Sequence, residues 1–575
     1  MAAPTLLRFV LALAVALAFA APLFSAAPAR DDALRLAPPD AAFVVVVQNA
    51  RDHLRNVAES PFAQWFPTSA LGKQFLAGGE LKQFRQVGEP LFTELGTSPE
   101  ELLNDVLGEA VVFAYTPPAA GRAAEEQAVI LIRPRKPETL TRLLDRVNAL
   151  QTKSGELNAV VKRTHGGQPF FERQKAGGSS EFYCFRGPVF AFSSSEADIQ
   201  AVIDRDRAVL KGEVPELTTK LTRLGVADAL AVVLINPRRL DAELDAKVNG
   251  TKGEERAILE KFRDVWTATD SAAAYLALDR DIEAGLSVRF DPDKLPPWSR
   301  GWLTGPKTAP GLWAAVPDDA LFALAGRFRA AELLELILAI LPEEGKKTLS
   351  AAVADTLGPV VGKDKLPLVL NALGPDWAVW VEPPRGEGFL PMVVAAVQVS
   401  GEGPETKTAA DAIHQGVKFG FQTLRVMYNA GHTDQIELQE TQDGDVTITS
   451  MVNDKGFPPG FRPSFALKGG YLLVASDPDA IKRFRPPSGT PKPGGEVLVA
   501  RFSGSGTRLY LQTHGPRLAK FLAGVGGADE GELTAVLAQV ASALEPLDKL
   551  ELVTRSDESS LRIAIRAKLV KPLKK

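Results

Sequence analysis

One stretch of this chain occurs twice, and this internal repeat limits the possible folds more than any other feature. Residues 96–118, GTSPEELLNDVLGEAVVFAYTPP, return as residues 362–384, GKDKLPLVLNALGPDWAVWVEPP, at an offset of 266 without a gap. The identical positions are Gly96/Gly362, Leu102/Leu368, Leu107/Leu373, Gly108/Gly374, Pro117/Pro383 and Pro118/Pro384.

Both copies predict the same local structure. Ser98 and Asp364 stand at matching positions and suit a helix N-cap. Gly108 and Gly374 stand where a helix is expected to stop. An apolar run of strand length follows in each copy and ends at Pro-Pro. The predicted unit is therefore a capped helix, a glycine stop and a buried strand.

Further landmarks recur in the same order at offsets between 266 and 282, such as Ser194 with Ser476 and Arg239 with Arg517. A chain of 575 residues is also too long for one core. We therefore expect two repeats, 39–294 and 316–569, joined by a linker rich in Pro and Trp at 295–315. Strands and helices interleave without regular βαβ alternation, which predicts an α+β fold. Each repeat is expected to form a mainly antiparallel sheet with helices packed on one face.

The N-terminal segment predicts export. Arg8 is the only charged residue before Arg30, and a continuous apolar run lies between them. We expect a signal peptide over residues 1–29, with cleavage after Ala20 or after Ala29. The exported protein is then periplasmic or extracellular. The alternative is an uncleaved segment that anchors the protein in the inner membrane.

Charge and cysteine content exclude some classes of protein. The formal net charge of -4 argues against a dedicated nucleic-acid binder. The single cysteine, Cys184, permits no intramolecular disulfide. It lies in a strand-like aromatic run, which favours a small buried hydrophobe over a nucleophile. The C-terminal tail, residues 570–575, continues the lysines that begin at Lys568. We interpret it as a solvated tail, and the alternative is a weak contact with an anionic membrane surface.

The sequence predicts no catalytic residue, metal ligand or cofactor. The five histidines form no metal-ligand spacing with carboxylates, so we interpret them as solvated side chains: His53, His165, His414, His432 and His514. Residues 279–285, DRDIEAG, resemble a calcium loop but lack its glycine at the sixth position and its glutamate at the twelfth. This segment instead predicts a hairpin turn.

Three tryptophans crowd the linker: Trp298, Trp302 and Trp313. Tryptophan buries a large area where domains meet, so we expect these side chains at the junction of the repeats. Any sizeable pocket should border them, because clefts between domains are favoured ligand sites. The alternative is an aromatic platform for a ligand.

The N-terminal signal, the Pro-Pro-Asp-Ala-Ala-Phe-Val start of the first strand at Pro38 and the Leu-Gly strand motif at Leu107 resemble a family of exported bacterial proteins classified only as a domain of unknown function. This resemblance implies export and transfers no functional residue. The leading hypothesis is a non-enzymatic envelope protein that binds a partner protein or an apolar ligand through its paired repeats. The alternative is a periplasmic hydrolase whose site is assembled from distant residues. The oligomeric state is left open.

Overall fold

A computed structural model describes residues 29–570 except 60–62, 64, 69, 79–87, 119–125, 209–213, 280, 306, 401–402 and 489–494. The predicted signal peptide before Ala29 and the last five residues of the predicted tail lie outside the described residues. Within the described part, no helix is both long enough and apolar enough to cross a membrane.

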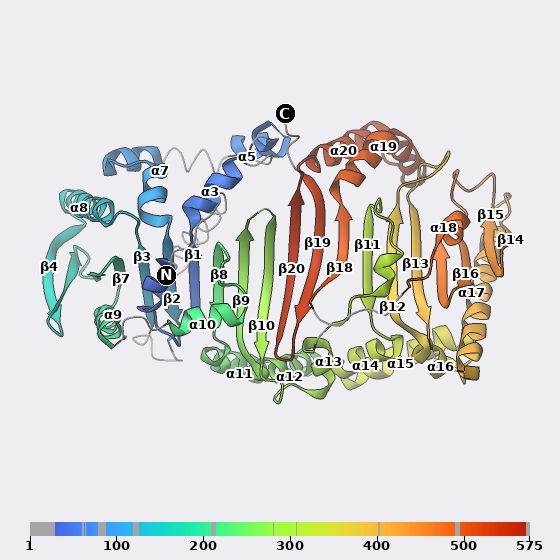
Figure 1. Ribbon diagram of the computed structural model, residues 1–575, viewed down its shortest axis with the longest axis horizontal. Helices are drawn as coiled ribbons and strands as arrows, with labels where there is room; N and C mark the ends of the chain where they lie inside the picture. The colour runs from blue at the N-terminus through green and yellow to red at the C-terminus, as the bar shows by residue number, and fades with distance from the viewer. Residues whose placement is uncertain are drawn as a thin grey trace.

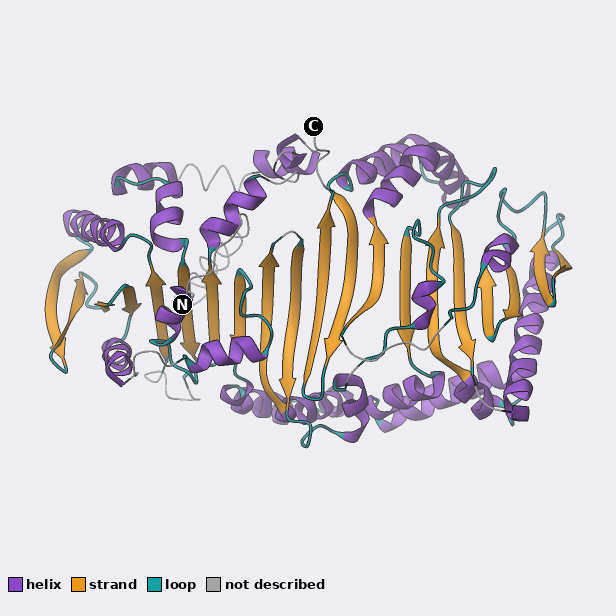
Figure 2. Ribbon diagram, in the orientation of Figure 1, coloured by secondary structure: helices purple, strands orange, loops and turns teal. Residues whose placement is uncertain are grey.

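All strands of the described chain join one sheet of 20 strands, which runs along the longest axis of the molecule (Figures 1 and 2). Apolar and β-branched side chains dominate most of them, as suits a pleated and half-buried surface. The strands before the linker are β1 (Phe43–Gln48), β2 (Ala110–Thr116), β3 (Gln127–Arg133), β4 (Leu157–His165), β5 (Gln168–Lys175), β6 (Ser180–Arg186), β7 (Val189–Ser193), β8 (Ala231–Ile235), β9 (Thr269–Leu278) and β10 (Ile282–Phe290). Those after it are β11 (Phe322–Arg327), β12 (Leu373–Glu382), β13 (Met392–Val399), β14 (Glu437–Asp443), β15 (Val446–Val452), β16 (Ser464–Lys468), β17 (Tyr471–Ala475), β18 (Glu496–Ser503), β19 (Leu547–Ser556) and β20 (Ser560–Leu569).

The two sets of strands follow the same order in the sheet. From one edge the order is β4-β5-β6-β7-β3-β2-β1-β8-β9-β10. It continues as β20-β19-β18-β11-β12-β13-β17-β16-β15-β14. All neighbours are antiparallel, and the second set repeats the first when it is traced from the opposite edge. The pairing of β10 with β20, in which Leu286 lies opposite Ile563, joins the two halves and is called the central junction below.

The helices lie mostly between the strands in sequence. In the first half they are α2 (Ala29–Leu34), α3 (Ala50–Ala58), η1 (Phe66–Thr68), α5 (Ala70–Ala77), α7 (Pro99–Glu101), the π-helix η2 (Leu102–Leu107), α8 (Pro137–Ser154), α9 (Glu196–Ala208), α10 (Glu216–Arg223), η4 (Pro237–Arg239), α11 (Asp241–Gly250) and α12 (Gly253–Ala268). The linker forms α13 (Pro297–Leu303) and η5 (Gly311–Ala314). The second half has α14 (Ala330–Ile340), α15 (Glu343–Val361), α16 (Leu366–Ala372), α17 (Gly403–Gly431), α18 (Pro478–Arg483), α19 (Gly504–Gly526) and α20 (Glu530–Ala543).

One face of the sheet, here called the covered face, carries the main core of each half. In the first half, α2, α9 and α10 pack Leu34, Ile199 and Leu221 against alternate strand residues such as Val44 and Val112. In the second half, η5 and α18 pack against the equivalent strands through residues such as Leu312 and Ile481.

The opposite face, here called the open face, is covered only in part. Helix α3 packs near Val47 and Leu276 at one end of the strands, and α12 and α13 pack near Val288 and Phe290 at the other end. Figure 1 shows helices beyond both ends of the strands, with α11 to α16 in one row. The prediction of α+β structure is confirmed. Helices pack on both faces rather than on one, because most strands place apolar residues on both sides.

The duplicated stretch forms a helix followed by an inner strand in each half. In the first copy, the Ser98 hydroxyl accepts a hydrogen bond from the Glu101 amide at 3.0 Å, and η2 leads into β2. In the second copy, α16 leads into β12. Strand β2 lies between β1 and β3, and β12 lies between β11 and β13.

Two details of this prediction are wrong. Asp364 does not cap a helix, because α16 begins at Leu366 after Lys365. Gly374 does not end a helix, because it lies within β12 with φ of 114°. A Cβ at Gly374 would lie 2.5 Å from the carbonyl oxygen of Phe328, so glycine permits the close approach of these two segments. Gly108, by contrast, is the C-cap of η2.

The first core begins earlier in the chain than residue 39. Leu34 and Leu36 are 2% and 0% exposed, and both belong to the first core. In the second half, η5 lies within the predicted linker and buries Leu312 in a similar way before β11. The linker therefore contributes to the second core as well as connecting the halves.

Candidate functional site

A groove of about 1150 Å³ opens on the open face beside the central junction. Helices α13 and α14, the end of β11 and the segment after α13 form its walls. Side chains of β18, β19 and β20 also line it: Val497, Val499, Thr554, Leu561 and Ile563. The groove therefore lies where residues from the linker meet strands of the second half.

Aromatic rings form one wall of this groove. The ring of Phe328 lies 6.0 Å from that of Trp302 and 5.0 Å from that of Trp377, between ring centres. Gly326 makes room for this arrangement, since a Cβ there would lie 2.3 Å from a ring carbon of Trp377. The wall presents a large apolar area on rigid side chains, which is typical of sites that hold apolar ligands.

Charged residues also line this groove. The Lys307 ammonium donates hydrogen bonds to the carbonyl oxygens of Gly301 and Trp302, at 2.9 and 3.0 Å. Burial lowers the pKa of Lys307. Arg327 lies 3.4 Å from the Asp376 carboxylate, and Arg329 also lines the groove. Glu332 and Glu335 of α14 complete the charged part of the lining.

The structure brings two of the three predicted tryptophans to the groove. Trp298 and Trp302 line it from α13, and both are half-buried. Trp313 is also half-buried but lies elsewhere, packed against the second core. Its indole N–H donates to the Leu498 carbonyl at 2.6 Å, and the Arg501 guanidinium lies 5.8 Å from its ring centre. Trp377, which lies in the strand predicted after Gly374, is also part of the groove.

The sequence analysis missed the open apolar face beside the groove. Leu286 of β10 is 44% exposed, and Ile563 and Ile565 of β20 are 38% and 51% exposed. The register places these side chains on the same side of the two paired strands. Leu550 of β19 continues this surface with 37% exposure. The alternation of apolar and polar residues in β10 and β20 indicates that each strand has one apolar face. It does not show which face of the sheet the helices cover.

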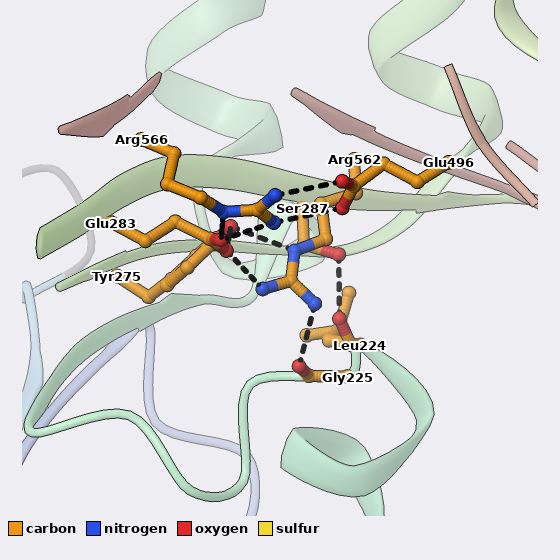
Figure 3. Close-up of polar contacts among 8 residues, drawn as sticks. All are labelled: Leu224, Gly225, Tyr275, Glu283, Ser287, Glu496, Arg562 and Arg566. Atoms are coloured by element: carbon orange, nitrogen blue, oxygen red, sulfur yellow. Dashed lines mark hydrogen bonds and ion pairs between the residues drawn. The ribbon is translucent and has the colours of Figure 1, made fainter. Parts of the chain in front are cut away.

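The covered face of the central junction holds a polar cluster instead of an apolar one (Figure 3). Glu283 of β10 accepts hydrogen bonds from Tyr275 at 2.8 Å and from Arg562 and Arg566 of β20 at 2.5 and 2.8 Å. Arg566 also binds Glu496 of β18. The predicted hairpin is confirmed, since β9 and β10 pair as antiparallel neighbours, and Glu283 is the second residue of β10.

Hydrogen bonding and burial set the ionisation of this cluster. Burial opposes ionisation of Glu283, but hydrogen bonds from Tyr275 and both arginines outweigh it and lower the pKa of the carboxyl group. Burial and the hydrogen bond to Glu283 raise the pKa of Tyr275 to about 12. The cluster is therefore an ionised carboxylate between two guanidinium groups, which suits a structural contact.

Other candidate chemical groups lie away from the groove. Cys184 is fully buried, as predicted, and burial raises the pKa of its thiol to about 12. The imidazole of His165 lies 2.9 Å from the Asp204 carboxylate at the surface. None of the residues that line the groove is a histidine, cysteine or serine. In the described part of the chain, no group of three or more His, Cys, Asp or Glu side chains is placed to hold a metal ion.

Comparisons with protein-family models, with curated proteins and with solved structures found no match to this chain. The resemblance to a family of exported bacterial proteins stays a prediction. The groove and the open face are therefore interpreted from their own geometry.

Proposed function

We propose that this protein is an exported, non-enzymatic envelope protein that binds an apolar ligand on the open face of its sheet. The observation that carries the proposal is the groove of about 1150 Å³ next to exposed Ile563 and Leu286. Soluble proteins rarely expose adjoining large apolar side chains without a binding role. The groove is also large enough for a ligand of several hundred Å³.

We further propose that the two halves are tandem repeats derived by duplication. Their shared strand order and the equivalent places of residues 96–118 and 362–384 support this view. The groove lies beside the contact between the two proposed repeats, since Leu561 and Ile563 of its lining belong to β20, which pairs with β10. The exposed apolar surface continues from Ile563 in the groove onto Leu286 of the first repeat, so both repeats contribute to the proposed binding surface.

The Lys307 ammonium favours an apolar ligand with an acidic head group, such as a fatty acid. The Lys307 ammonium has two of its three N–H donors on carbonyl oxygens, which leaves one for a ligand. Arg329, whose side chain is exposed, is a second cation in the lining. An acyl chain would lie along Ile563 and Leu286, while its carboxylate lies near Lys307.

Quenching of tryptophan fluorescence by a brominated fatty acid tests this proposal. Bromine quenches only nearby indoles, and Trp298, Trp302 and Trp377 line the groove. We expect saturable quenching by a bromostearate. Ile563→Glu should weaken binding at least about tenfold, since it removes roughly 1.4 kcal/mol or more of apolar contact.

A matched control is Val525→Glu. Val525 lies on α19, is 74% exposed and does not line the groove, so this variant should bind like the wild type. Absence of saturable quenching in the wild type would reject the acyl ligand. Equal weakening in both variants would place the ligand outside the groove. Turnover of an ester substrate at the groove would favour the hydrolase alternative.

A further inference from the structure

Two strands, one at each end of the sheet, have a partner on one side only. Among the described residues β4 pairs only with β5, and β14 pairs only with β15. Figure 1 shows them at opposite ends of the molecule. Most residues of both strands are exposed, including Val160 and Val161 of β4 at 38% and 37%. Such free edges are templates for pairing with another chain.

These two edges carry charges of opposite sign. Strand β4 contains Lys162 and Arg163 and no acidic residue. Strand β14 contains Glu437, Glu440 and Asp443 and no basic residue. Some charges are already neutralised within the chain, as in the contact of Glu440 with Lys418 at 2.7 Å. No described residue forms an ion pair with Lys162 or Glu437.

The directions of the strands allow the sheet to continue from one copy to the next. In a fully antiparallel sheet of 20 strands, the first and last strands run in opposite directions. Strand β4 of one copy therefore meets β14 of another copy in antiparallel orientation when the sheet is extended. Two β4 strands can also pair, but that arrangement brings like charges together, which is destabilising.

The side-chain pattern selects a register. Lys162 lies on the open face of β4, and Glu440 lies on the open face of β14. Placing these two residues opposite each other also places His165 opposite Glu437 on the covered face. The same register lays β4 beside exposed Val426 of α17, which borders β14 in a shallow groove with Leu438. Pairing would thus cover apolar area as well as match charges.

We propose that copies of this protein associate head to tail through β4 of one copy and β14 of the next. The interface is heterologous, because each copy contributes a different edge. It therefore generates rings or open chains rather than a closed two-fold dimer. The proposal does not depend on the apolar ligand, since neither edge lies at the groove.

Sedimentation velocity of the full mature chain at low ionic strength, over a wide range of concentrations, tests the proposal. We expect the average mass of the wild type to rise with concentration. Lys162→Glu and Glu440→Lys should each weaken self-association at least tenfold, while circular dichroism shows both variants folded. An equimolar mixture of the two variants, and the double variant, should associate like the wild type.

Lys520→Glu on α19 is the matched control, because it makes the same charge change at an exposed site away from both edges, and it should associate like the wild type. A wild type that stays monomeric at all concentrations would overturn the proposal. So would a mixture of the two charge variants that stays monomeric while the wild type associates. Restored association in that mixture distinguishes edge pairing from a general effect of net charge.

Discussion

A single carboxylate, that of Glu283, ties the two halves together on the covered face. It binds Arg562 and Arg566 across the central junction, and its side chain is 14% exposed. Removing one partner of a shielded ion cluster costs more than the contact itself is worth, because the remaining charges stay poorly solvated. Glu283 therefore matters more to the junction than exposed pairs such as Arg256 with Glu260.

We predict that Glu283→Gln lowers the free energy of unfolding at pH 7 by about 2 kcal/mol. The folded protein lowers the pKa of Glu283, so its stabilising contribution is present above the ordinary value of 4.5 and is lost as the pH falls through the lowered pKa. Urea unfolding at a series of pH values should show the difference between variant and wild type shrinking below pH 4.5. A difference that is constant with pH would contradict this account.

A second prediction concerns Gly326 in the wall of the groove. Gly326→Ala should destabilise the protein by about 1–3 kcal/mol, because the new Cβ would overlap the ring of Trp377. Gly301→Ala is the control: it lines the same groove from α13, but no atom lies within 4 Å of its added Cβ. Thermal unfolding of both variants checks this contrast, and equal effects would contradict it.

At the scale of the elements, the sequence predicted local structure well where the cause is local. Ser98 caps its helix because its hydroxyl can reach a free amide three residues later. Cys184 is buried because it lies within a short apolar run. The prediction that Asp364 caps a helix is wrong, because α16 begins at Leu366. Pro367 suits the first turn of a helix and so favours that start. The pairing of β10 with β20 was not predictable, because it joins residues 282 and 567 and leaves no local pattern.

Helix α13 yields a prediction at the same scale. Trp302 packs its ring against Phe328 and so holds α13 beside the second half. Trp302→Ala should remove roughly 1.5–3 kcal/mol of apolar contact, and limited proteolysis should then cut faster near residues 291–315. Two stable fragments are the expected product. Uniform degradation, or a rate equal to that of the wild type, would show that Trp302 does not hold the linker.

On the scale of the whole molecule, the halves share one sheet rather than meeting as two separate bodies. The internal repeat predicted two similar halves but not their connection, since a repeat says nothing about which edges meet. The groove lies beside that connection and is lined by the linker and the second half. The sequence predicted a pocket beside the tryptophans of the linker. It did not predict Trp377 and Ile563 in the lining, because they line the groove only when β12 and β20 lie in one sheet. The candidate site was therefore predictable in its location and only partly in its residues.

Separate expression of the halves tests the role of the shared sheet. Residues 30–305 and 307–570 produced alone each expose one long edge, β10 or β20, that is paired in the full chain. We expect both fragments to aggregate alone and to form a soluble 1:1 complex when co-expressed, because each then covers the edge of the other. Size-exclusion chromatography with light scattering checks this, and two soluble monomeric fragments would contradict it.

The pairing of β10 with β20 also bears on descent. In an ancestor of half this length, as the proposed duplication implies, the strand equivalent to both would have paired with its own copy, giving a two-fold symmetric homodimer. Fusion into one polypeptide frees the two copies to diverge. In such a dimer a residue faces its own copy only on the two-fold axis, so an off-axis pair of opposite charges, like that of Glu283 on β10 with Arg566 on β20, would have been present twice.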